Sequence, residues 1–93
     1  MPMNKRFHAF YSGSVHGVGF RYTAQSAASA YGVDGWVMNL PDGRVELVCE
    51  GKDDAVARLF KKISDVFGSY ISAADVREEK YIGEFTDFDI RFD

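Results

Sequence analysis

Hydrophobic positions along the chain repeat first with the period of a strand and then with that of a helix. In residues 7–12, Phe7, Ala9 and Tyr11 lie on one side of an alternating pattern and Phe10 lies on the other. Apolar groups on both faces are typical of a central strand. From Phe20 to Tyr31 the apolar residues recur at helical spacing, and Gly32 follows where a C-terminal cap belongs.

The remainder of the chain shows two strand patterns, a helix pattern and two further strand patterns. Residues 33–38 and 44–50 predict the arms of a hairpin, joined by a tight turn over residues 40–43 that contains Pro41 and Gly43. Residues 53–67 predict a helix that ends at Gly68, with a buried stripe, and residues 73–81 and 88–92 predict the last two strands. The stripe residues are Val56, Leu59, Phe60, Ile63 and Phe67.

Within the second arm of the hairpin, side chains of opposite character alternate. Val45, Leu47 and Cys49 are expected to face the core, and Arg44, Glu46 and Glu50 are expected to face solvent.

This order of elements predicts an α+β fold of the ferredoxin-like type. We expect a β-α-β-β-α-β sandwich, with a short terminal strand included, in which two helices cover one face of an antiparallel sheet. The 93 residues are expected to form one domain, 1–93. The fold class alone does not define a function, because many unrelated activities share it.

Composition and charge exclude several classes of protein. The net charge of -3 argues against a nucleic-acid-binding protein, which usually has an excess of basic residues. Cys49 is the only cysteine, so it predicts a buried small side chain and no internal disulfide. His8 and His16 are too isolated to predict a metal site. No stretch approaches the about 20 apolar residues of a membrane span, and no secretory leader pattern opens the chain. We therefore expect a cytoplasmic protein that needs no metal and binds no membrane.

The segment from Ser12 to Arg21 is the candidate for an anion site. Gly13, Gly17 and Gly19 allow backbone conformations in which consecutive N–H groups point at one oxyanion. The helix that follows adds the positive end of its dipole, and Arg21 adds a guanidinium that suits two phosphate oxygens. The alternative is an ordinary glycine-rich turn with an exposed arginine.

Asn39 is the candidate for a second role, because it ends a predicted strand directly before the hairpin turn. Its amide can accept a hydrogen bond from a water molecule without becoming charged. The alternative is a turn asparagine whose side chain bonds to its own backbone.

Together the two segments resemble the acylphosphatase family, whose signature reads roughly G-x-V-x-G-V-x-F-R, followed by G-W-V-x-N and a turn. The matching residues of the first part are Gly13, Val15, Gly17, Val18, Phe20 and Arg21, and those of the second part are Gly35, Trp36, Val37 and Asn39. The resemblance implies hydrolysis of acyl phosphates to a carboxylate and inorganic phosphate, without a cofactor.

The resemblance also implies a role for each site residue. Arg21 would grip the phosphoryl group, and Asn39 would position the attacking water. The backbone N–H groups of the loop would surround the phosphate and form a phosphate cradle. The loop residues are Val15, His16, Gly17, Val18, Gly19 and Phe20. The substrate's own phosphate would accept the proton of the water.

At His16 the chain departs from the family, many members of which have glutamine at this position. Because the cradle would act through backbone amides, we expect the change to be tolerated and the His16 side chain to face solvent. If the imidazole faces the anion instead, activity should rise as the pH falls.

Two other classes of function remain as alternatives. Gly17 to Phe20 superficially resembles an aromatic RNA-binding motif, but that motif belongs on a strand with basic neighbours. A noncatalytic anion-sensing module would use the same loop without turnover. The main prediction is a monomer that binds a small acyl phosphate, with inorganic phosphate as product and inhibitor and no nucleic acid as partner.

Overall fold

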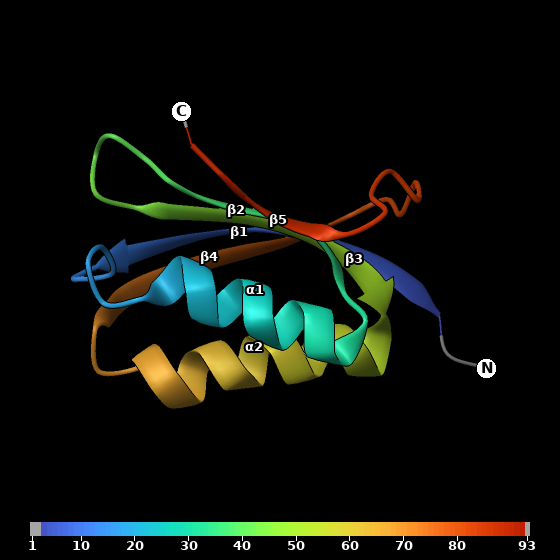
Figure 1. Ribbon diagram of the computed structural model, residues 1–93, viewed down its shortest axis with the longest axis horizontal. Coiled ribbons are helices and arrows are strands. Elements are labelled where there is room, and N and C mark those ends of the chain that lie inside the picture. Colours follow the sequence, from blue (N-terminus) through green and yellow to red (C-terminus); the bar gives the residue numbers. More distant parts are fainter. Residues whose placement is uncertain (1–2, 93) are drawn as a thin grey trace.

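A computed structural model describes residues 3–92 and shows two helices packed against one face of a five-stranded sheet (Figure 1). The elements in chain order are β1 (Asn4–Gly13), α1 (Phe20–Tyr31), β2 (Asp34–Asn39), β3 (Val45–Lys52), α2 (Asp53–Phe67), β4 (Ile71–Glu79) and β5 (Phe88–Arg91). Both helices have the predicted extents. The strands differ from their predicted ranges by one to three residues at their ends, and β4 begins two residues early.

The strand order β4-β1-β3-β2-β5 confirms the predicted fold class and the central place of β1. β1 pairs antiparallel with β3 on one side and with β4 on the other. The sheet is antiparallel except at one edge, where β5 runs parallel to β2. This exception arises because the 80–87 segment carries the chain from the β4 edge to the opposite edge and reverses its direction.

The hydrophobic core lies between the helices and the sheet, as the two amphipathic patterns predicted. From α1, Ala24, Ala27 and Ala28 are buried. Four residues of the predicted α2 stripe are buried, and the fifth, Phe60, is only partly buried against this core; the four are Val56, Leu59, Ile63 and Phe67. Small alanine side chains allow α1 to approach the sheet closely, while the larger side chains of α2 fill the rest of the layer. Neither helix is long and apolar enough to cross a membrane.

Cys49 is completely buried in this core, which confirms its predicted environment. Burial raises the pKa of the thiol to about 12. The thiolate is the nucleophilic form of cysteine, so this side chain is unreactive in the folded protein.

The face of the sheet away from the helices is not fully exposed, which corrects one expectation. Glu50 was expected to face solvent with Arg44 and Glu46, but only 3% of it is exposed. Val48 on the same face is also buried. The reason is tertiary: the 80–87 segment lies over this end of the open face in Figure 1 and bonds to the Glu50 carboxylate.

The carboxylate of Glu50 holds this segment through three backbone donors. The N–H groups of Ile82 and Gly83 donate to Oε2 at 3.0 and 3.2 Å, and the N–H of Glu84 donates to Oε1 at 2.8 Å. Arg6 adds an ion pair at 3.3 Å. Burial alone would raise the pKa of Glu50, but these donors outweigh it and the pKa lies below its ordinary value.

This arrangement predicts an acid-dependent loss of stability. Since the folded protein lowers the pKa of Glu50, its contribution is complete above the unfolded pKa of about 4.3 and is lost as the pH falls through the folded value. We expect Glu50→Gln to lower the free energy of unfolding at pH 7 by about 2 kcal/mol, because a buried charge-assisted hydrogen bond is lost. Urea denaturation at pH 7, 5 and 3 should show this difference shrink in acid.

Glu84→Gln is the control, because Glu84 bonds to the same Arg6 at 2.8 Å but its side chain is half exposed. We expect a change below about 0.5 kcal/mol for this exposed pair. An equal effect of the two substitutions would contradict the special role of Glu50.

Candidate active site

The loop between β1 and α1 is anchored at both ends, so its backbone has a defined path. Val15 and Phe20 bury their side chains in the core. At the end of β1, Gly13 has a φ of 121°, and a Cβ there would lie 2.3 Å from the carbonyl oxygen of Tyr70. Next to it, the N–H of Ser14 donates to that same oxygen at 2.9 Å. Only glycine permits this close approach, which fixes the loop against the start of β4.

Beyond this anchor, the loop presents backbone N–H groups that have no acceptor in the described part of the protein. Gly17 and Gly19 have φ values of 74° and 80°, and Gly19 caps α1 without any side-chain hydrogen bond. The hydrogen bonds among residues 3–92 include none donated by the backbone N–H groups of residues 15–22. The first turn of α1 also contains no acidic residue. These donors and the positive end of the helix dipole form a site for an anion.

A pocket of about 230 Å³ brings this loop together with the two side chains predicted to act in catalysis. Its lining residues are Val15, Gly17, Gly19, Phe20, Arg21, Tyr22 and Asn39. His16 and Val18 do not line it: Val18 packs against the core, and the His16 side chain turns to the β2–β3 hairpin. Tyr22 is the lining residue that the sequence analysis missed. Its place beside Arg21 on the first turn of a helix was the available signal.

Arg21 carries a positive charge that no carboxylate of residues 3–92 neutralises. Arg6, Arg44 and Arg77 each form an ion pair, whereas the guanidinium of Arg21 lies over the ring of Phe92. The distance from its central carbon to the ring centroid is 5.1 Å. An aromatic face holds a cation without accepting its hydrogen bonds in the way a carboxylate does, so the donors of Arg21 remain available to an anion.

Asn39 ends β2 opposite Val45, and its Oδ1 atom is buried without a hydrogen-bond partner in the described chain. The turn that follows is closed by other groups, because Leu40 donates to the carbonyl of Arg44 at 2.8 Å and Gly43 donates to that of Leu40 at 3.1 Å. The interpretation of Asn39 as a turn residue bonded to its own backbone is therefore wrong. A buried acceptor without a donor is costly, and a bound water would satisfy it.

The His16 side chain connects the loop to the hairpin that carries Asn39. Its Nε2 lies 2.9 Å from the carbonyl oxygen of Arg44. Because a carbonyl oxygen only accepts, Nε2 must carry the hydrogen in this contact. The side chain is exposed, as expected, and it points to the hairpin rather than into the pocket. Figure 1 shows this hairpin and the loop at the same end of the molecule.

The chemistry of the pocket is limited to donors, one cation and one amide. No histidine, aspartate or glutamate is among its lining residues. Within residues 3–92, no group of three or more His, Cys, Asp or Glu side chains is placed to hold a metal ion. The residues present can bind an oxyanion and orient a water molecule, but they include no side chain of ordinary basicity to take its proton.

Comparison with protein families shows the family to which the chain belongs. The model of the family described as acylphosphatase matches residues 7–90, nearly the whole chain. The chain belongs to the acylphosphatase family.

Relatives with the family name are similar over nearly their full length. An acylphosphatase from Syntrophobacter fumaroxidans is 50% identical over 91 residues, which cover 95% of this chain and 92% of that protein. One from Syntrophus aciditrophicus is 44% identical and covers 98% and 96% of the two chains. The crystal structure of acylphosphatase from Bacillus subtilis has a TM-score of 0.85 at 31% identity, covering 96% of this chain and 99% of that one. The resemblance found in the sequence is thereby confirmed for the family and the fold.

The link between His16 and the hairpin predicts which replacements the acylphosphatase loop tolerates. We expect His16→Gln to keep stability, because its amide can donate to the Arg44 carbonyl in place of Nε2. His16→Ala removes the donor and should lower the free energy of unfolding by about 0.5–1 kcal/mol. Urea denaturation of both variants measures the difference, and equal stability of the alanine and glutamine variants would contradict the link.

Proposed function

We propose that this protein hydrolyses acyl phosphates to a carboxylate and inorganic phosphate. One observation carries the proposal: within residues 3–92, a single pocket combines backbone donors that have no acceptor, the Arg21 guanidinium without an ion pair and the buried Oδ1 of Asn39 without a hydrogen-bond partner. The first two features suit a phosphoryl group, and the third suits the water that attacks it. Membership in the acylphosphatase family supports the same conclusion.

In this proposal, the loop and Arg21 bind the phosphoryl oxygens. The backbone N–H groups of residues 15–20 surround the oxygens, and the guanidinium donates to two of them at once. Negative charge spreads over these oxygens in the transition state, so donors fixed in advance lower the barrier. Since the protein has a net charge of -3, this attraction is local to the pocket.

Asn39 orients the water that attacks phosphorus. Its Oδ1 accepts one hydrogen of the water, which turns a lone pair of the water oxygen toward the phosphorus atom. The amide is held at the end of β2 by the hairpin, so it loses little freedom when the water binds.

The proton of the water passes to the substrate. A bond forms between the water oxygen and phosphorus, and the bond between phosphorus and the acyl oxygen breaks. The electron pair leaves with the carboxylate, and a phosphoryl oxygen takes the proton because the pocket lining offers no carboxylate or imidazole. The carboxylate is a stable leaving group, so positioning and charge stabilisation suffice.

The remaining functional predictions are consistent with this proposal. Inorganic phosphate presents the same oxygens as the substrate and should compete with it. One chain supplies every lining residue of the pocket, so we propose that a monomer is active. The cytoplasmic location stays a prediction from the sequence.

A noncatalytic anion-sensing module is the second candidate. Such a module would need the loop and Arg21 to bind an anion, but it would not need a buried hydrogen-bond acceptor beside them to hold a water molecule. The unpartnered Oδ1 of Asn39 therefore favours hydrolysis. The RNA-binding interpretation has no strand to support it, because residues 17–20 form the loop and the first residue of α1.

Arg21→Lys tests the binding of the phosphoryl group. The lysine keeps the charge but loses the planar pair of donors, and we expect kcat/KM for acetyl phosphate to fall at least about 100-fold, on the order of the loss of an oriented donor in an enzyme site. Arg58→Lys on α2 is the matched control and should keep the activity of the parent. Full activity of a folded Arg21→Lys variant would contradict the proposed binding of the phosphoryl group by Arg21.

Asn39→Ala tests the positioning of water apart from the binding of phosphate. We expect kcat to fall about 100-fold or more, while the inhibition constant of inorganic phosphate stays within about twofold, because the amide acts only when water attacks. Steady-state kinetics with phosphate as inhibitor measures both quantities on one sample.

The control is Asn4→Ala. Asn4 is the other asparagine of the sequence, and it lies at the start of β1. Its kcat should match that of the parent. A variant at Asn39 that keeps its kcat but loses stability would show a structural role and not a catalytic one.

A further inference from the structure

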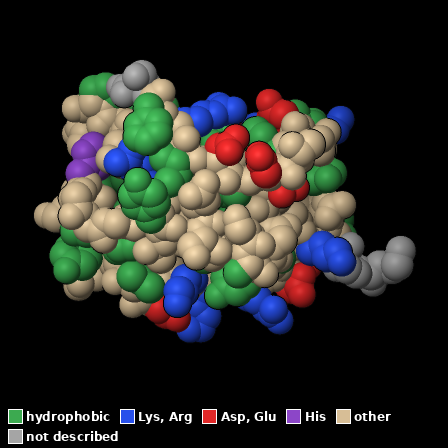
Figure 2. Space-filling model, viewed as in Figure 1, with side chains coloured by type: hydrophobic (Ala, Val, Ile, Leu, Met, Phe, Trp, Pro, Cys, Tyr) green, Lys and Arg blue, Asp and Glu red, His purple; other side chains and the backbone are tan. Residues whose placement is uncertain are grey.

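Two aromatic side chains next to Arg21 are exposed to an unusual degree. Tyr22 is 70% exposed and Phe92 is 74% exposed, whereas most large apolar side chains of the described residues are buried or partly buried. Tyr22 lines the phosphate pocket, and the Phe92 ring lies 5.1 Å from the guanidinium carbon of Arg21. In Figure 2, hydrophobic side chains lie around basic atoms at the left end of the molecule, the end that carries the β1–α1 loop in Figure 1.

The geometry of the reaction decides on which side of phosphorus the acyl group must lie. In an in-line displacement the attacking and leaving oxygens lie on opposite sides of the phosphorus atom. The Oδ1 of Asn39, which would hold the water, is buried. The acyl group therefore lies on the side of the pocket that is open to solvent. Two exposed rings are near it: that of Tyr22, which lines the pocket, and that of Phe92, which lies against the guanidinium of Arg21.

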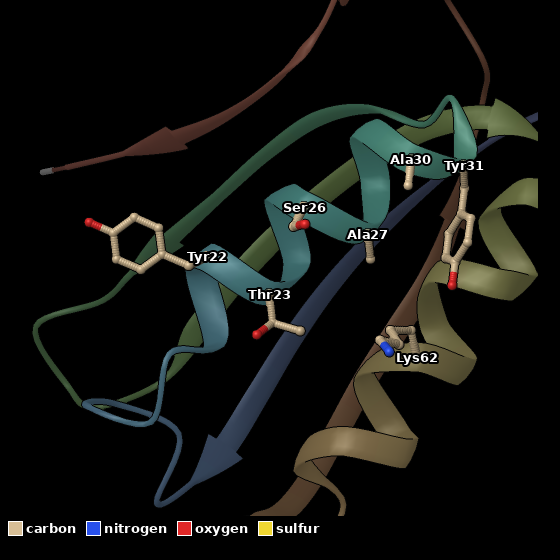
Figure 3. Close-up of a pocket in the computed structure, with 7 residues that line it drawn as sticks. All are labelled: Tyr22, Thr23, Ser26, Ala27, Ala30, Tyr31 and Lys62. Atoms are coloured by element: carbon tan, nitrogen blue, oxygen red, sulfur yellow. The ribbon is translucent and has the colours of Figure 1, made fainter.

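A larger hollow between the helices is separate from this mouth. It has a volume of about 390 Å³ and is lined by Tyr22, five further residues of α1 and Lys62 of α2. Figure 3 shows that the Tyr22 ring points away from Ser26, Ala27 and Ala30, beyond the first turn of α1. Tyr22 therefore lies at the edge of this hollow, and its ring extends past the end of α1 that holds Arg21.

We propose that Tyr22 and Phe92 form a subsite for the acyl group and give the enzyme a preference for acyl phosphates with aromatic acyl groups. The inference rests on the proposed hydrolysis of acyl phosphates and names the part of the substrate that the phosphate cradle does not touch. A flat acyl group at the mouth can pack against the two rings while its phosphoryl group stays on the loop and Arg21. Phe92 is held in place for this contact by its stacking on Arg21.

The physical basis of the preference is the contact between aromatic rings. A methyl group at the mouth leaves both rings in water, whereas a phenyl group covers part of each of them. One aromatic contact contributes roughly a two- to tenfold change in affinity. The preference should thus depend on both side chains and disappear when both are removed.

Binding of two stable analogues tests the subsite without any turnover. In 2-oxopropylphosphonate and 2-oxo-2-phenylethylphosphonate, a CH₂ group replaces the bridging oxygen of acetyl phosphate and benzoyl phosphate. We expect calorimetry to show tighter binding of the phenyl compound by the parent protein. Tyr22→Ala and Phe92→Ala should each reduce the ratio of the two affinities by about two- to tenfold, and the double variant should bring it close to one.

Ile82→Ala is the control, because Ile82 is a large apolar residue that is 61% exposed, its N–H bonds to Glu50, and it does not line the pocket of Arg21 and Asn39. It should leave the ratio unchanged. Equal affinity of the parent for the two analogues, or an unchanged ratio in the double variant, overturns the subsite. Hydrolysis of acetyl phosphate by the parent is measured separately, so that a failure of the proposed function is distinguished from a failure of the subsite.

Discussion

The candidate site depends on a run of backbone N–H groups that have no acceptor among the described residues. Residues 15–22 donate no hydrogen bond to any described residue, and no side chain caps the start of α1. Unpaired donors of this kind are unfavourable in a folded protein unless water or a ligand meets them. The surrounding structure keeps them apart from possible acceptors: Val15 and Phe20 are buried on either side, and the first turn of α1 has no acidic residue.

The position of β1 gives this loop a rigid base. β1 is an interior strand of the sheet, paired with β3 and with the edge strand β4, and the loop leaves its end beside the start of β4. A central strand is restrained on both edges, so the geometry of the loop does not rely on a flexible edge. At the other end of the sheet, the Glu50 carboxylate accepts hydrogen bonds from the 80–87 segment and fixes the path by which the chain reaches β5. β5 then runs beside β2, and Phe92 follows its end and meets Arg21.

The hairpin between β2 and β3 supplies the other half of the site. Pairing of Asn39 with Val45 places the amide at the last position of β2, and the turn is closed by Leu40, Gly43 and Arg44 without it. The contact of His16 with the Arg44 carbonyl joins this hairpin to the loop. A donor that spans the two segments restrains their separation, which in the proposed mechanism is the distance between the bound phosphoryl group and the water. Positioning in this enzyme therefore depends on contacts outside the pocket as well as within it.

Local patterns in the sequence determined both helices, the core stripe of α2, the burial of Cys49 and the glycine-rich loop before α1, because these depend on spacing and on residues near one another in the chain. The family signature at Arg21 and Asn39 was readable for the same reason. Only the tertiary structure decided the parallel pairing of β5, the burial of Glu50 and the place of Phe92 over Arg21. Each of these depends on where the 80–87 segment crosses the sheet, and nothing in the alternation of residues 45–50 or 88–92 indicates what will cover a strand or lie at its end. Contacts between segments distant in sequence are set by the packing of the whole chain.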